Sequence, residues 1–172
     1  MYLLRNNDLR KDKTTRGILD AQSVQNADTA EEKGYDAGKK TSGIKRHIAV
    51  DTQSLPHALG VTTADVTDRD GAITLISANL ESLSGVRKFI ADGGYSGENF
   101  AKSVKELCGA EVEVVKRNEL HTFAVLPKRW VVERAFGWLD KARRLWKNCE
   151  RKLHTSLQMM ILAFISVLIR RF

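Results

Sequence analysis

The chain contains very little cysteine and proline, with two residues of each among 172. Neither Cys108 nor Cys149 lies in a paired spacing such as C-x2-C, which excludes a zinc-finger motif and a disulfide framework. We therefore expect two ordinary thiols in a reducing compartment. The sequence also lacks internal repeats and low-complexity tracts, so nothing in it indicates a second domain.

Long apolar runs are missing as well. The first residues are polar and charged, which argues against a signal peptide. The most apolar stretch, residues 157–169, contains Ser166 and is shorter than the roughly 20 residues that span a bilayer. We expect a buried terminal helix there, no membrane segment, and a cytoplasmic protein associated with the nucleoid.

The charge balance is basic, with 28 Lys and Arg against 21 Asp and Glu and a net charge of +7. A basic surplus favours a polyanionic partner, chiefly nucleic acid, with an anionic membrane surface as the alternative. Composition alone is equally compatible with a basic protein that has no such partner.

Hydrophobic periodicity and turn residues predict a mixed α/β sheet with helices packed on it. The expected elements are a strand over 17–24, a loop over 28–43, a hairpin of 45–53 and 57–64, a helix over 72–83, a strand over 87–91, a helix from Ser96 to Leu107, a strand over 111–116, and helices over 128–147 and about 155–170.

The expected helix over 128–147 has apolar residues at three- and four-residue steps, which predicts one buried stripe. The stripe comprises Val132, Ala135, Phe136, Leu139, Ala142 and Trp146. Exposed tryptophans could stack on unpaired bases. Tryptophan at helical spacing is more often a core residue, however, and we expect Trp146 to be buried.

Three acidic residues stand out by their surroundings. Asp20 lies within an otherwise uncharged strand, where an ionised side chain is costly unless it is paired. Asp92 follows a strand and precedes two glycines, at the kind of strand end where ligands bind in α/β sheets. Glu133 lies on the long helix, off its apolar stripe. Together these carboxylates could bind two Mg²⁺ ions about 3.5–4 Å apart.

Taken singly, each acid also has a simpler interpretation. Asp20 could be an exposed strand residue and Asp92 a turn or cap residue. Glu133 could form an i,i+4 ion pair with Arg129, which contributes only about 0.3–0.5 kcal/mol.

Basic residues near Glu133 on the helical wheel suit a site that holds an anionic backbone. The wheel places Arg129, Lys141 and Arg144 there, along with Gly137, and glycine inside a helix usually has a packing or approach reason. Lys45 and Arg46 form a further basic pair. We expect these five cations to contact DNA, while a solvated face with ion pairs is the alternative. The four histidines receive no role.

Six strings occur in one order along the chain. They are LDAQSV (19–24), GYDAGKK (34–40), KRHIAVDT (45–52), VTDRDGA (66–72), ADGGYSG (91–97) and KRWVVERAFGWL (128–139). Together they resemble the DDE transposases of bacterial insertion sequences, in the group named after insertion sequence five. The resemblance covers residues 17–171.

The resemblance implies a ribonuclease-H-like fold with a mixed five-stranded sheet. It implies that Asp20, Asp92 and Glu133 are the catalytic, metal-binding residues, with Mg²⁺ as cofactor and Mn²⁺ tolerated. The implied activity is DNA cleavage and strand transfer at the ends of an insertion sequence.

The family also carries a Y-x2-R-x3-E-x6-K signature around its Glu. Arg129 and Glu133 match it, but Leu126 replaces the Tyr and Asp140 replaces the Lys. The role of that Lys could pass to Lys141 or Arg144.

Only 19 residues precede Asp20, whereas family members usually have a longer N-terminal DNA-binding region. We expect a lead-in over 1–16 and a catalytic domain over 17–172, either as the downstream frame of a two-frame element or as a truncated copy. Expected partners are the terminal inverted repeats, target DNA, and an upstream-frame product or full-length transposase, and a homodimer is left open. The alternative function is a catalytically silent DNA-binding or dimerising remnant.

Overall fold

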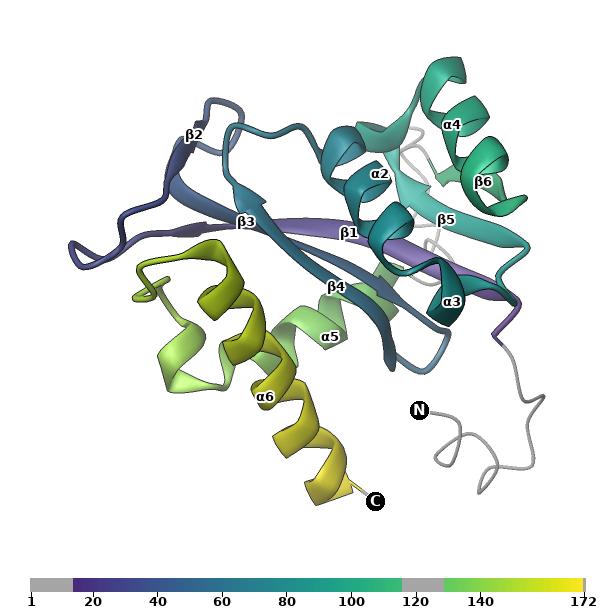
Figure 1. Cartoon of the computed structure of the whole chain (residues 1–172). Coiled ribbons are helices and arrows are strands. Elements are labelled where there is room, and N and C mark those ends of the chain that lie inside the picture. Colours follow the sequence, from purple (N-terminus) through teal and green to yellow (C-terminus); the bar gives the residue numbers. More distant parts are fainter. Residues whose placement is uncertain (1–13, 116–128, 172) are drawn as a thin grey trace, which may run out of the picture.

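A central sheet with helices on both faces forms the fold, as the computed structural model shows for residues 14–115 and 129–171 (Figure 1). The strands are β1 (Arg16–Gln25), β2 (Gly34–Asp36), β3 (Thr41–Val50), β4 (Pro56–Thr63), β5 (Lys88–Asp92) and β6 (Glu111–Val115). The α-helices are α2 (Asp68–Ala78), α3 (Leu80–Leu83), α4 (Glu98–Cys108), α5 (Arg129–Asp140) and α6 (Leu153–Arg171), with short 3-10 turns η1 (Gly93–Tyr95) and η2 (Arg143–Leu145).

The sheet is mixed, as the sequence predicts. Its order is β2-β3-β1-β5-β6. The strand β4 stands outside this order and also pairs with β3. The strands β1, β3 and β4 are antiparallel neighbours, whereas β5 is parallel to both β1 and β6. The five expected strands are therefore present. The short β2 adds a sixth strand within residues 28–43, where the sequence analysis expects only a loop.

Alternating side chains of the strands build two separate cores. Leu19 and Ala91 point to one face, where they pack with α2 and α4. Ile18 and Ile90 point to the other face, where they pack with α5 and α6. Figure 1 shows this division, with α2, α3 and α4 on one side of the sheet and α5 and α6 on the other. Residues with even numbers in β1 and β5 therefore face α5.

The helix that contains Glu133 is shorter than predicted. The α5 helix ends at Asp140, and Ala142 has extended backbone angles that turn the chain into η2. Buried Arg46 donates a 2.8 Å hydrogen bond to the carbonyl oxygen of Leu145, which fixes this turn against β3. The prediction that Trp146 is buried is wrong, because its side chain is 75% exposed. Trp146 lies beyond the end of α5, so its spacing from the apolar residues of the helix does not place it in the buried stripe.

The last helix, α6, is covered on one side only. Met160 and Phe164 are buried against the sheet, whereas Leu162, Ile165 and Ile169 are exposed. The prediction of a well-covered helix is thus half right. By length and composition α6 could cross a membrane, and core helices of soluble proteins share this property. Its buried contacts with the sheet identify it as a packing helix of this fold.

Candidate functional site

Asp20 and Asp92 lie side by side on adjacent parallel strands. Ile18 of β1 pairs with Ile90 of β5, and each aspartate follows two residues later on the same strand. Because side chains alternate along a strand, both aspartates point to the face that α5 covers. Both side chains are half-buried. The sheet therefore places both carboxylates on the same face, on neighbouring strands.

Backbone hydrogen bonds orient both carboxylates. Asp20 Oδ1 accepts a 2.8 Å hydrogen bond from the amide of Ala21. Asp92 Oδ1 accepts a 2.9 Å bond from the amide of Gly94, and in this way caps η1. Neither of the two glycines after Asp92 has a positive φ, so the turn itself does not require glycine at either position. Gly93 has open space around its missing side chain.

A third aspartate, Asp68 in the first turn of α2, lies close to Asp92. A methyl group on Gly94 would lie 3.1 Å from Asp92 Oδ1 and 3.6 Å from Asp68 Oδ2, so the two carboxylates flank the same space. Lys45 Nζ lies 2.9 Å from Asp68 Oδ1 and 3.4 Å from Asp36 Oδ2. The sequence analysis did not select Asp68. Its only signal was its place in the string VTDRDGA, one of the six that carry the family resemblance.

Tyr95 marks the place where these acids gather. Its phenol is buried, and burial raises its pKa well above the ordinary value. The negative charges of Asp20, Asp68 and Asp92 raise the pKa further, which places all three carboxylates within electrostatic reach of one hydroxyl. Tyr95 is therefore held neutral beside an acidic pocket.

Glu133 lies on the exposed side of α5. Val132, Ala135 and Phe136 on the helix are buried, and Glu133 projects away from them. Asp140, seven residues or about two helical turns further, lies on the same side of the helix as Glu133. Its carboxylate accepts hydrogen bonds of 3.2 and 3.3 Å from the amide of Gln22 on β1. This side of α5 thus faces the strand that bears Asp20.

Gly137 lies between Glu133 and Asp140 on the same side of the helix. A methyl group at this position would meet no atom within 4 Å. Packing against the described residues therefore does not require a glycine there.

The donor set suits a hard divalent cation only in part. Oxygen ligands from Asp20 and Asp92 have the chemistry that Mg²⁺ or Mn²⁺ prefers, and they share one face of the sheet. In the described parts of the chain, however, no three His, Cys, Asp or Glu side chains are close enough together to hold a metal ion. The two aspartates lie on neighbouring strands, and Glu133 does not form a three-ligand cluster with them in this structure.

The predicted DNA contacts differ in their exposure. Lys45 and Arg46 are 5% and 1% exposed, and their side chains bind Asp68, Asp36 and the carbonyl oxygen of Leu145. Neither can reach a DNA phosphate from there, so the structure argues against this part of the prediction. The mistake arose because β3 is buried on both faces, which a polar sequence does not indicate.

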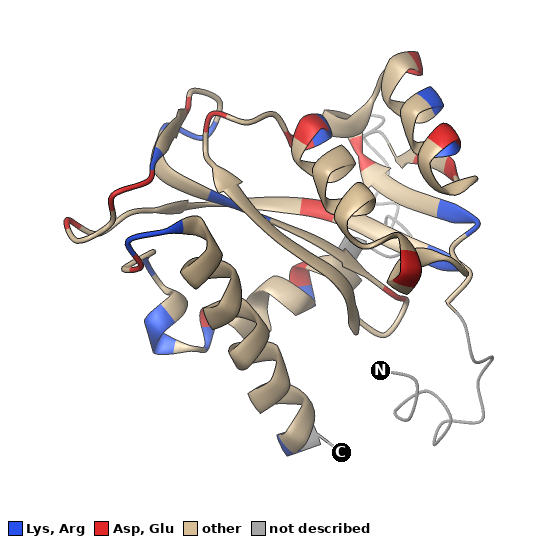
Figure 2. Cartoon of the chain, viewed as in Figure 1, with Lys and Arg blue, Asp and Glu red and all other residues tan. Residues whose placement is uncertain are grey.

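Lys141 and Arg144 are exposed beyond the end of α5. Arg144 Nε donates a 2.9 Å hydrogen bond to Glu150 Oε1, which raises the pKa of Arg144 further. Arg129 is the first residue of α5, and its side chain lies outside the described residues. Figure 2 shows Lys and Arg concentrated along the segment between α5 and α6.

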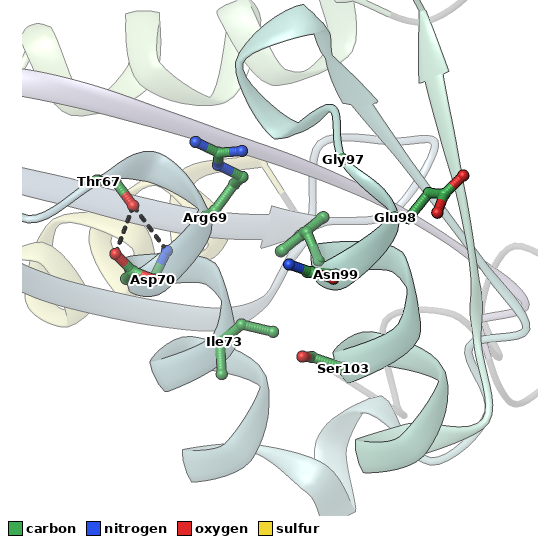
Figure 3. Close-up of a pocket in the computed structure, with 9 residues that line it drawn as sticks. Thr67, Arg69, Asp70, Ile73, Gly97, Glu98, Asn99 and Ser103 are labelled. Atoms are coloured by element: carbon green, nitrogen blue, oxygen red, sulfur yellow. Dashed lines mark hydrogen bonds between the residues drawn. The ribbon is translucent and has the colours of Figure 1, made fainter.

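Two shallow grooves open near the acidic pocket. One of about 550 Å³ runs over the β2–β3 turn and includes Lys39, Lys45, Asp68 and Gly94. The other, of about 580 Å³, lies between α2 and the start of α4 (Figure 3). In it Thr67 caps α2 by binding Asp70, while Arg69 points toward Gly97. Both grooves are open and contain acidic as well as basic residues, so neither resembles an enclosed small-molecule pocket.

Comparison with known proteins gives three consistent likenesses. The family model described as the transposase DDE domain matches residues 11–168. A curated protein of Burkholderia cepacia, assigned as the transposase for insertion sequence element IS402, is 34% identical over 117 residues. That match covers 64% of this chain and 55% of the relative, so the chain spans about half the length of the relative it matches.

The third likeness is to a solved structure, the catalytic core domain of BIV integrase. It superposes with a TM-score of 0.54 at 14% identity and covers 89% of this chain and 82% of the integrase domain. At this identity the likeness shows the fold alone. It confirms the predicted ribonuclease-H-like architecture.

Proposed function

Because the chain belongs to the transposase DDE domain family, we propose that it catalyses metal-dependent cleavage of DNA and transfer of the cut strand at the ends of an insertion sequence. The observation that carries this proposal is the position of Asp20 and Asp92, each two residues beyond the Ile18–Ile90 pair of neighbouring parallel strands, on the face of the sheet that the helix bearing Glu133 covers. Two adjacent carboxylates and a third on a covering helix suit metal-assisted phosphoryl transfer.

In this proposal Asp20, Asp92 and Glu133 hold Mg²⁺, with Mn²⁺ as a substitute. The bound metal supplies Lewis acidity that activates a water or a 3′-hydroxyl and stabilises the leaving oxygen. The backbone amides of Ala21 and Gly94 fix one oxygen of each aspartate. Lys45 holds Asp68 beside Asp92 and balances part of the negative charge.

Exposed cations hold the DNA in this proposal. Lys141 and Arg144 follow α5 directly, and Arg129 begins it, so these three cations flank Glu133 along the chain. The overall charge of +7 favours binding to the phosphate backbone. The implied partners are the element's terminal repeats and target DNA, reached in the cytoplasm at the nucleoid. An upstream-frame product, a full-length transposase or a second copy is a further partner in this proposal.

The experiment uses labelled element-end DNA and Mg²⁺, with this chain and with a fusion to the upstream frame. We expect cleavage that Asp92→Asn, Asp20→Asn or Glu133→Gln reduces at least a hundredfold. Glu106→Gln is the matched control, because this exposed carboxylate on α4 pairs with exposed Lys102 four residues away. DNA binding without cleavage by either protein would favour the silent remnant. Cleavage that survives Asp92→Asn would refute the assigned site.

A further inference from the structure

Arg134, the residue after Glu133, is held by the turn between β3 and β4. Its Nε donates a 2.8 Å hydrogen bond to Ser54 Oγ, and its Nη2 donates a 2.7 Å bond to the carbonyl oxygen of Gln53. The guanidinium also lies 4.6 Å from the ring centre of Trp130 and 5.4 Å from that of Trp138. These two tryptophans lie one helical turn before and after Arg134, so the cation is enclosed between them.

The turn that receives Arg134 is itself firmly built. Ser54 has a positive φ of 69° and is fully buried, and its hydroxyl donates a 2.5 Å hydrogen bond to the carbonyl oxygen of Val131. Buried Asp51 accepts bonds of 2.8 and 3.0 Å from the amides of Gln53 and Leu55. A single hydroxyl, that of Ser54, therefore joins the turn to the α5 backbone and to Arg134.

Arg134 and Glu133 lie on opposite flanks of the buried stripe of α5. Successive helical residues are rotated by about 100°, which places Arg134 toward the β3–β4 turn and Glu133 toward β1. Asp140, on the flank of Glu133, confirms the second direction through its bonds to Gln22. Rotating the helix about its axis would thus move both residues together.

Apolar burial alone does not set this rotation, because hydrophobic contacts are non-directional. The buried stripe of α5 has small Ala135 at its centre, between the larger buried side chains of Val132 and Phe136. The two hydrogen bonds of Arg134 are directional and restrict that angle. The turn between β3 and β4 therefore influences the direction in which the Glu133 side chain points.

We propose that Arg134 is a positioning residue, which sets the rotation of α5 and so directs Glu133 toward β1, the strand that bears Asp20. This inference rests on the proposed function, since it assigns Glu133 to the metal site. Arg134 itself touches neither metal nor DNA in this role. Its effect passes entirely through Glu133.

The test measures Mn²⁺ binding by titration calorimetry in two backgrounds, the natural chain and Glu133→Gln. Arg134→Met keeps the apolar stem between the tryptophans and removes both hydrogen bonds. We expect it to weaken Mn²⁺ binding about tenfold when Glu133 is present, as partners of metal ligands often do. In the Glu133→Gln background the same change should have no effect. Arg134→Lys should restore part of the affinity.

Two further variants keep the test decisive. Ser54→Gly removes the bridging hydroxyl and suits the positive φ, so it should repeat the Glu133-dependent loss even if Arg134→Met unfolds the chain. Arg151→Met is the control, because this exposed arginine pairs with Glu31 away from α5. Equal losses in both backgrounds, or no loss in folded variants, would overturn the positioning role. Mn²⁺ binding unaffected by Asp20→Asn and Asp92→Asn would instead overturn the proposed metal site.

Discussion

Three consecutive polar residues, Lys45, Arg46 and His47, are buried in the middle of β3. Lys45 pairs with two aspartates, Arg46 donates a hydrogen bond to the carbonyl oxygen of Leu145, and His47 makes a 2.9 Å contact with Thr62 Oγ1. Among the described residues, Arg46 Nε, Arg46 Nη1 and His47 Nδ1 have no hydrogen-bond partner. Burial lowers the pKa of Arg46 to about 10, although the charge of Asp140 opposes this. Of the three residues, Lys45 therefore has the ion pairs that a buried charge requires.

His47 should make the protein sensitive to mild acid. Burial lowers its folded pKa to about 4, against about 6.5 when unfolded, so between these values only the unfolded chain binds the proton. Stability is complete above pH 6.5 and falls by about 3 kcal/mol as the pH approaches 4. Urea unfolding from pH 7.5 to 4 should show this loss, and His47→Gln should reduce it. An unchanged slope in folded His47→Gln would contradict the assignment.

At the scale of elements, α5 and α6 share one face of the sheet but differ in how they are fixed. The hydrogen bonds of Arg134 and Asp140 hold both flanks of α5. The helix α6 relies on a narrow stripe around Met160 and Phe164. Directional hydrogen bonds thus hold α5, the helix whose rotation matters for the proposed chemistry. Apolar contacts hold α6, which covers the sheet.

The two sides of α6 should respond differently to substitution. Phe164→Ala removes a fully buried ring and should cost about 3–5 kcal/mol of unfolding free energy, because a cavity remains. Ile169→Lys lies on the exposed side, where we expect a change within about 0.5 kcal/mol. Chemical denaturation of both variants measures the contrast. A large loss for Ile169→Lys would mean that a partner covers this side of α6.

At the scale of the whole molecule, the sheet separates a core under α2 and α4 from a core under α5 and α6. The two aspartates point toward the second core at its edge, where Glu133 and the exposed cations after α5 also lie. The basic segment between α5 and α6 therefore lies on the same face as the proposed metal site (Figure 2).

Binding to DNA should depend strongly on salt, because each neutralised phosphate releases counterions. We expect Lys141→Met and Arg144→Met each to reduce the slope of log affinity against log salt by about 1. Lys102→Met, which removes an equally exposed cation on α4, is the matched control. Fluorescence anisotropy over a range of KCl concentrations measures the slopes. Equal effects of all three variants would refute a DNA-binding face beside α5.

The sequence by itself determined the order of the five expected strands and of the helices, the strand that carries Asp20, and the strand end at Asp92. These follow from local periodicity and turn residues, which act over a few neighbours along the chain. The resemblance to the DDE transposases also came from the sequence and is supported by the family match.

Only the tertiary structure decided which polar residues are buried and where α5 ends. Lys45 and Arg46 looked like DNA contacts until β3 proved to be covered on both faces, and Trp146 looked like core until the helix ended before it. Asp68 and the bonds of Arg134 to Ser54 join positions far apart in the chain. Burial and side-chain partners are long-range properties, so no pattern of neighbouring residues specifies them.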